Sequence, residues 1–151
     1  MELIKARIDR VIGTTGQDYA VVLTAETKSF LVFVGQPEVA AIYRELKGLA
    51  MQRPMAHDVI VNTLRGFDID VRMIVISSIV ESVFCATLLL RQGQNGEEGI
   101  ATNDVRLDLR ASDAMIVALK TGSQLWVSRE ILDSVEDVSA LLPDDDDLSM
   151  E

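Results

Sequence analysis

The stretch Val71–Leu90, VRMIVISSIVESVFCATLLL, decides the fold of this chain. A helix of this length could cross a membrane, but Arg72, Ser77 and Glu81 are among the polar residues that interrupt it. Its first half is rich in Val and Ile, which favour β-strands. We therefore predict two buried strands joined by a turn near Val80–Ser82, and no membrane-spanning helix.

Shorter segments with strand or helix periodicity surround this hairpin. Strands are predicted at 1–12, 19–24, 30–34, 104–109 and 125–127, and helices at 37–48, 58–65, 113–120 and 128–132. Gly48, Gly66 and Gly122 are typical of helix C-termini. Ser112 and Ser128 are typical N-cap residues for the last two helices.

The order of these segments predicts the fold class and the domain limits. Strands outnumber helices and come in hairpins, which favours a single α+β domain over residues 1–135. Its sheet should be mixed but largely antiparallel, packed with about four helices. Residues 136–151 are expected to form an acidic, disordered tail. The N-terminus lacks the continuous apolar core of a signal peptide, so a cytoplasmic location is expected.

The charge of the chain restricts what it can bind. Its 151 residues are 48% hydrophobic and 25% charged, which is typical of a globular protein. The formal net charge is −10, half of it on residues 144–151. Phosphate backbones favour basic surfaces. Nucleic-acid binding would therefore need a local basic groove, or metal ions that offset the carboxylates.

Two hexapeptides place an arginine ahead of an aspartate that opens a predicted helix. They are Arg53-Pro54-Met55-Ala56-His57-Asp58 and Asp108-Leu109-Arg110-Ala111-Ser112-Asp113. A carboxylate at a helix start is stabilised by the helix dipole. Arg53 and Arg110 could form ion pairs with these aspartates, or could bind a phosphate bidentately. The sequence leaves both roles open.

A set of candidate catalytic residues follows from the same hexapeptides. His57 is the only histidine and Cys85 the only cysteine, which excludes zinc sites with several His or Cys ligands. We predict His57 as a general base, with Asp58 and Asp113 as its catalytic partners. The simpler alternative is a half-exposed histidine beside two helix-capping carboxylates.

Oxygen ligands for Mg²⁺ or Mn²⁺ are a second prediction. If the fold gathers the helix starts at one end of the sheet, their carboxylates could hold such an ion. It would activate water and stabilise phosphoryl charge. The candidate ligands are Asp58, Asp108, Asp113 and Glu130.

Three short segments carry a resemblance to a known family. They are Arg53-Pro54 with His57-Asp58, then Asp108-x-Arg110-x-Ser112-Asp113-Ala114, then Val127-Ser128-x-Glu130. In order and spacing they resemble the bifunctional nuclease domain family, over about residues 1–135. Leu109 and Ala111 stand where that family commonly has Ala and Pro. The resemblance implies a mixed α/β domain with a large sheet, a homodimer, and nuclease activity on DNA and RNA.

These observations favour a metal-dependent phosphodiesterase, in which Arg53 and Arg110 hold the phosphate of a DNA or RNA substrate. The rival hypothesis is a non-catalytic homo-oligomeric module that binds a ligand or a protein. In that case the same Arg and Asp residues are ion pairs that fix loops around helix starts. A third hypothesis is a regulatory protein whose acidic tail binds a basic partner.

Overall fold

The computed structural model describes residues 1–14, 16, 18–93 and 102–142. Within them, the strands form one 7-stranded sheet in the order β3-β2-β1-β7-β4-β5-β6. The strands are β1 (Leu3–Gly13), β2 (Tyr19–Ala25), β3 (Lys28–Val34), β4 (Ile69–Val80), β5 (Val83–Gln92), β6 (Asn103–Arg110) and β7 (Leu125–Ser128). The helices are α1 (Gln36–Lys47), α2 (Ala56–Gly66), α3 (Ala111–Thr121), α4 (Arg129–Ser134) and the short 3₁₀ helix η1 (Ser139–Leu141).

The short strand β7 joins two antiparallel halves of the sheet. It pairs antiparallel with β1, where Leu3 lies opposite Ser128, and parallel with β4, where Ile74 lies opposite Leu125. All other pairings are antiparallel. The predicted α+β class with a mixed, largely antiparallel sheet is therefore confirmed.

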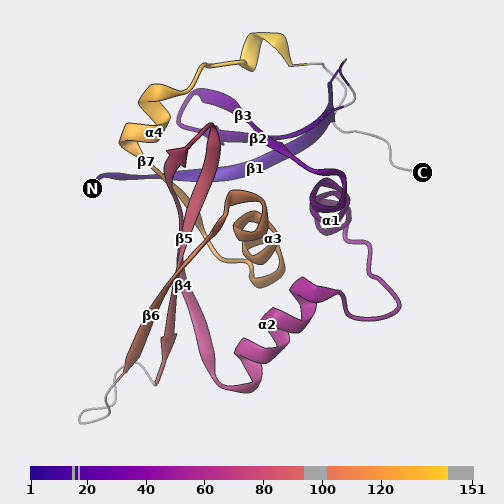
Figure 1. Ribbon diagram of the computed structural model, residues 1–151, viewed down its shortest axis with the longest axis vertical. Helices are drawn as coiled ribbons and strands as arrows, with labels where there is room; N and C mark the ends of the chain where they lie inside the picture. Colours follow the sequence, from indigo (N-terminus) through magenta and orange to yellow (C-terminus); the bar gives the residue numbers. More distant parts are fainter. Residues whose placement is uncertain (15, 17, 94–101, 143–151) are drawn as a thin grey trace.

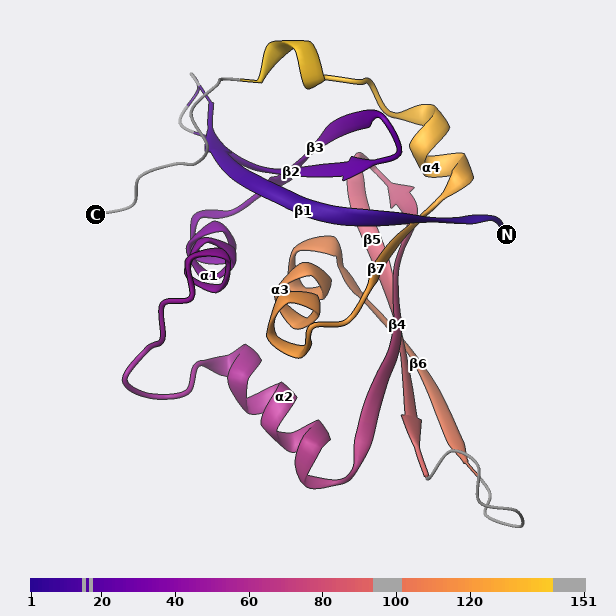
Figure 2. The same cartoon turned by 180° about the vertical axis from the view of Figure 1, so that it is seen from behind.

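Helices α1, α2 and α3 lie on one side of the sheet, with α3 nearest its middle (Figure 1). Seen from behind, α4 lies near the end of β7, away from α2 (Figure 2). Residues 114–118 of α3 are all buried, because the helix is packed against the sheet and against α1. Met115 and Ile116 thereby join Ile74 and Ile76 in the hydrophobic core.

The hairpin predicted from the opening stretch is present. Strands β4 and β5 pair through Val80 and Val83, and the two residues between them, Glu81 and Ser82, have φ of 50° and 68°. Two successive residues with positive φ make the tight turn that suits the twist of a hairpin. No helix in the described part of the chain is long and apolar enough to cross a membrane.

Some helix ends differ from the sequence prediction. Helix α3 begins at Ala111 with Arg110 as its N-cap residue, so Ser112 lies buried inside the first turn and is not the cap. Ser128 is a cap as predicted, because its Oγ accepts a hydrogen bond from the Ile131 N–H at 3.2 Å. Gly122 ends α3 with φ of 67°, as predicted.

Residues 136–142, from the expected tail, run past the edge strand β3. The Asp137 carboxylate accepts hydrogen bonds from the backbone N–H groups of Ser29 and Ser139. The Val138 N–H donates to the Ser29 carbonyl at 2.8 Å. These bonds cover part of β3, which is otherwise an open sheet edge. The remainder of the expected tail, 143–151, lies outside the described residues.

Candidate functional site

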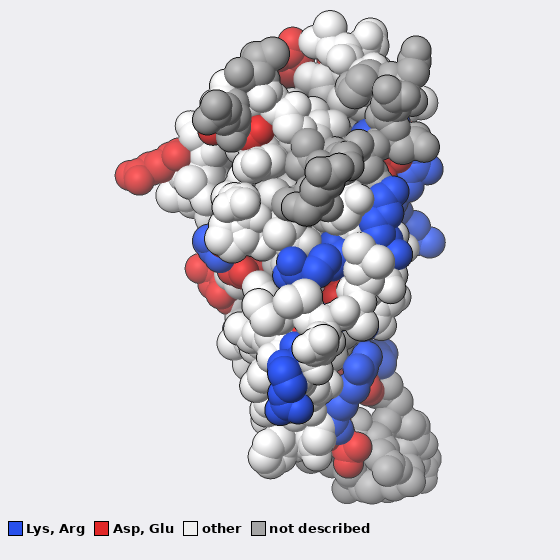
Figure 3. All heavy atoms as spheres, turned by 90° about the vertical axis from the view of Figure 1, so that its right-hand side faces the viewer, with Lys and Arg blue, Asp and Glu red and all other residues white. Residues whose placement is uncertain are grey.

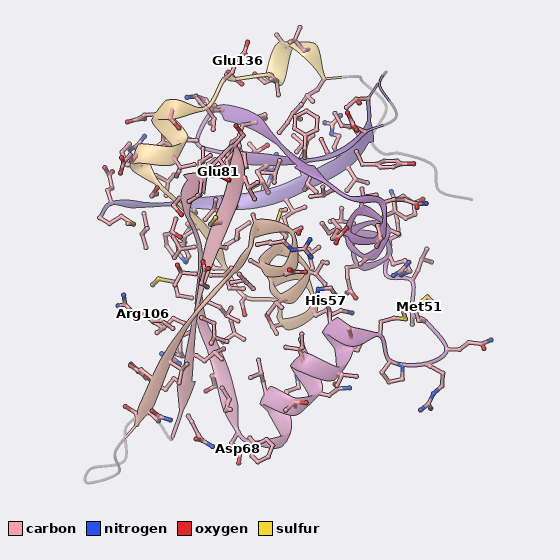
Figure 4. The ribbon with its side chains drawn as sticks, viewed as in Figure 1. Met51, His57, Asp68, Glu81, Arg106 and Glu136 are labelled. Carbon is pink, nitrogen blue, oxygen red and sulfur yellow. The ribbon has the colours of Figure 1, made fainter. Side chains whose placement is uncertain are left out.

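An open cavity of about 520 Å³ lies between α1, the loop 48–55 and the first turns of α2. Lys120, near the end of α3, contributes to its floor. The view with side chains shows His57 at the start of α2, facing α3, and Met51 on the loop between α1 and α2 (Figure 4). The cavity thus collects side chains from three helices and a loop.

Asp113 is the centre of the first charged cluster at this site. His57 Nε2 lies 2.9 Å from Asp113 Oδ1. Arg110 donates from Nε to Asp113 Oδ2 at 2.9 Å and from Nη2 to Oδ1 at 3.1 Å. Arg110 Nη2 also lies 3.2 Å from Oε1 of Glu38 on α1. Of the two roles open for Arg110, the structure shows the ion pair with Asp113.

The charge of Asp113 decides which ring nitrogen of His57 carries a hydrogen. Burial alone would raise the pKa of the Asp113 carboxyl, but hydrogen bonds from Arg110 and His57 outweigh it and hold that pKa below its usual range. The ionised carboxylate can only accept a hydrogen bond. His57 therefore carries a proton on Nε2, and in its neutral form Nδ1 is the nitrogen that can take up another.

Lys120 is the centre of the second cluster. Its Nζ donates to Glu45 Oε1 on α1 and to Asp58 Oδ1 on α2. Burial lowers the pKa of the Lys120 ammonium, but these two hydrogen bonds outweigh it and raise that pKa above its usual value. Its side chain is only 13% exposed. Lys120, Glu45 and Glu38 are members of the site that sequence reasoning missed.

Asp58 both caps the start of α2 and forms an ion pair. Its Oδ2 accepts a hydrogen bond from the Met55 N–H at 2.8 Å, which stabilises the start of α2. Its Oδ1 accepts from Lys120, and this hydrogen bond is the main reason why the pKa of Asp58 lies below its usual range. Asp58 is paired with Lys120, and no ion pair joins it to Arg53 among the described residues.

Two arginines on the cavity wall have no such partners. Arg53 is exposed on the loop and Arg44, near the end of α1, is half-buried. Neither guanidinium makes a hydrogen bond or ion pair with any residue that the structure describes. Arg44 is a further residue that sequence reasoning did not identify. Both guanidinium groups are therefore available to an anion.

Asp108 and Glu130 are not part of this site. Leu109 of β6 packs on the core, and side chains alternate along a strand, so Asp108 emerges on the opposite face of the sheet. Glu130 lies in α4, which Figures 1 and 2 place away from α2. The expectation that four carboxylates meet at one point is not met, because Asp108 lies on β6 and Glu130 at the start of a helix in another part of the fold.

The described residues do not fit a metal ion held by several protein ligands. Nowhere in the described ranges do three or more His, Cys, Asp or Glu side chains come together in a way that could hold one. Asp58 and Asp113 share the site, but Lys120 and Arg110 occupy the carboxylate oxygens that an ion would need.

The surface charge near the cavity is more favourable to anions than the composition suggests. On the side that carries α1 and α2, Lys and Arg side chains gather over the middle, while most visible Asp and Glu lie toward the edges (Figure 3). Among the described residues, this face therefore carries more cationic charge than the net charge of −10 suggests.

Comparison with known proteins assigns the family. The family model of the bifunctional nuclease domain matches residues 21–139, so this chain belongs to the bifunctional nuclease domain family. It is also similar to two uncharacterised proteins of Mycobacterium tuberculosis, MT1877 of strain CDC 1551 and Rv1829 of strain H37Rv. Each is 26% identical over 116 residues, covering 77% of this chain and 62% of the relative. The family suspected from the short segments is confirmed.

Proposed function

We propose that this protein is a nuclease that hydrolyses phosphodiester bonds of DNA or RNA at the His57–Asp113 pair. The observation that carries the proposal is the position of His57, held by Asp113 and lining a cavity that also contains the unpaired Arg44 and Arg53. A proton acceptor can activate the attacking water, and cationic donors in the same cavity can stabilise the charge that develops on phosphate. Membership of the family supports the same activity.

The chemistry assigns a role to each residue. His57 Nδ1 takes the proton of the attacking water as the water oxygen adds to phosphorus and the P–O bond to the leaving sugar oxygen breaks. The leaving oxygen takes up a proton from solvent, and the imidazolium loses its extra proton to solvent, which regenerates the base. Asp113 orients the imidazole and stabilises the imidazolium that forms. Arg53 and Arg44 hold the non-bridging phosphate oxygens and offset the charge of the transition state. Arg110, which the sequence assigned to phosphate, acts instead by positioning Asp113.

A requirement for Mg²⁺ or Mn²⁺ stays a prediction. Because Asp58 and Asp113 are engaged by Lys120 and Arg110, no step of this mechanism passes through a metal ion. A cleavage assay that includes these ions and EDTA measures the requirement directly.

The test is cleavage of end-labelled single-stranded DNA and RNA by highly purified protein in Mg²⁺, in Mn²⁺ and in EDTA. The Asp113→Asn and His57→Gln variants should each lose about 10²-fold or more in rate, a loss on the order expected for a general base. Matched carboxyl-to-amide variants outside the cavity, Asp108→Asn and Glu130→Gln, should cleave at the wild-type rate.

Two outcomes would contradict the proposal. Equal cleavage by wild type and Asp113→Asn would indicate a contaminating nuclease. Loss of cleavage in Asp108→Asn or Glu130→Gln with folding intact would place the active site elsewhere and restore the predicted metal ligands.

The alternative is a non-catalytic homo-oligomeric module. One observation favours it: on the sheet face opposite the helices, Leu3, Met73, Val75 and Leu89 line an apolar hollow of about 280 Å³. An apolar hollow at the surface can receive a side chain of a second copy of the chain. Light scattering of the purified protein measures the predicted dimer. A dimer without cleavage of any substrate would favour this module.

A cytoplasmic location also stays a prediction.

A further inference from the structure

Arg44 is the first reason to look for a specific ligand in the cavity. Its guanidinium is half-buried yet has no anionic partner within the described ranges, although Glu45 is its neighbour in sequence. Glu45 instead binds Lys120. A partly desolvated, unpaired cation is unfavourable until an anion reaches it. Because a guanidinium donates two parallel hydrogen bonds, the matching anion is a phosphate or a carboxylate.

The apolar part of the same cavity is the second reason. Leu49, Met51 and Met55 line it and are 55%, 49% and 46% exposed, so all three leave apolar surface open to a ligand. Methionine side chains are flexible and polarisable, and their sulfur atoms make favourable contacts with aromatic rings. Figure 4 shows Met51 on the loop between α1 and α2, and the cavity that Met51 lines is also lined by Arg44 and Arg53.

A ligand for this cavity needs an anionic group attached to a flat apolar one. We propose that the cavity holds one unpaired nucleotide of a single-stranded nucleic acid, its phosphate on Arg44 and Arg53 and its base against Leu49 and Met51. The cavity volume of about 520 Å³ suits a small-molecule-sized group. A base-paired nucleotide would first have to leave its stack, which costs energy.

This inference rests on the proposed nuclease function and adds its substrate class. The nucleotide beside His57 is then the one whose phosphodiester bond is cleaved, and single strands are preferred to duplexes. A free nucleoside monophosphate presents the same chemistry, so the experiment separates the two sources.

The test measures binding, not cleavage. Calorimetry with the full chain compares adenosine 5′-monophosphate, adenosine and inorganic phosphate. Fluorescence anisotropy compares a labelled single strand with the same strand in a duplex, and a gel after each titration verifies that the strand is intact. We expect the monophosphate to bind at least tenfold more tightly than adenosine or phosphate, and the single strand at least tenfold more tightly than the duplex.

The variants separate the two parts of the cavity. Arg44→Gln and Arg53→Gln should each weaken binding of the monophosphate and the strand by about tenfold or more, because each removes a charged hydrogen bond. Met51→Ser should weaken binding of the monophosphate but not of inorganic phosphate. Arg106→Gln is the matched control, because it removes a positive charge from the apolar hollow on the opposite sheet face. It should change the binding of neither the monophosphate nor the single strand.

Several results would overturn the inference. The duplex could bind as tightly as the single strand, or the monophosphate no more tightly than inorganic phosphate. Binding could be unchanged in folded Arg44→Gln and Arg53→Gln, or the protein could bind the free nucleotide but not the strand. If one of these results were found while the wild type cleaves nucleic acid and Asp113→Asn does not, the inference would be wrong and the proposed nuclease function would still hold. Strand binding without cleavage would instead uphold the inference and remove the nuclease function.

Discussion

Asp113 and Lys120 lie two helical turns apart on the same face of α3, and each holds the side chain of one of two consecutive residues of α2. Asp113 binds His57, and Lys120 binds Asp58. The same two residues also connect α3 to α1, through Arg110 to Glu38 and directly to Glu45. The start of α2 is therefore positioned by charge, and the groups that fix it also orient the candidate general base.

Lys120→Met tests the structural half of this arrangement. It leaves Asp58 and Glu45 without their half-buried cation, so we expect the free energy of unfolding to fall by about 1–3 kcal/mol. Urea denaturation measures the change. Arg72→Met, at an exposed position of β4, should change the free energy by less than about 0.5 kcal/mol. An equal loss in both variants would argue against a specific role for Lys120.

The stability of the protein should fall in acid because of Asp58 and Asp113. The pKa of each carboxyl is held below its usual range in the folded protein. The contribution of the two carboxylates to the free energy of unfolding is complete above the pKa of an unfolded aspartate, about 4. It is lost as the pH falls through their lower pKa values in the folded protein. Urea midpoints measured from neutral pH downward should decline less steeply in Asp113→Asn. An identical slope in the variant would contradict this assignment.

Ser128 and Ser112 form a matched pair of serine substitutions. Ser128→Ala removes the hydrogen bond to the Ile131 N–H and should cost about 0.5–2 kcal/mol of stability. Ser112 lies within the first turn of α3 and is not a cap, so Ser112→Ala should cost less. Thermal melts of both variants measure the difference, and the reverse order would mean that the cap of α3 is misassigned.

Glycines 122 and 66 make a second matched pair. Gly122 has φ of 67° and open space where a Cβ atom would lie, so Gly122→Ala should cost about 1 kcal/mol from backbone strain alone. Gly66 is the last residue of α2 and also has open space, so Gly66→Ala should be neutral or stabilise by up to about 1 kcal/mol. Urea denaturation measures the free energy of unfolding of both variants. Since neither substitution meets a neighbour, the difference between them reports the backbone strain at position 122.

The sequence predicted the local parts of the fold because local signals determine them. The β4–β5 hairpin follows from a run rich in Val and Ile and a second apolar run, which flank two polar residues. Gly48 and Gly122 each end a helix, because a single glycine can adopt the left-handed conformation needed there. The position of β7 between β1 and β4 depends on pairings between distant segments. No periodicity within a strand reports which neighbour it will have.

The same distinction explains the site. Arg110 and Asp113 are three residues apart at a helix start, so their pairing was among the local alternatives. Lys120, Glu45 and Asp58 come from three helices, and no pattern within one segment connects them. A signal was present in the seven-residue spacing that places Glu38 with Glu45, and Asp113 with Lys120, on shared helix faces.

The position of β7 also constrains how the chain reaches its native state. Among the described residues, β7 is the last strand in sequence, yet it is central in the sheet and is the strand that connects β1 to β4. The two halves of the sheet can form as separate hairpins early in synthesis, but each then exposes an unpaired strand edge. Closing the sheet requires contacts between the two ends of the domain, which makes folding slow. We therefore expect chains interrupted before Leu125 to aggregate through β1 and β4.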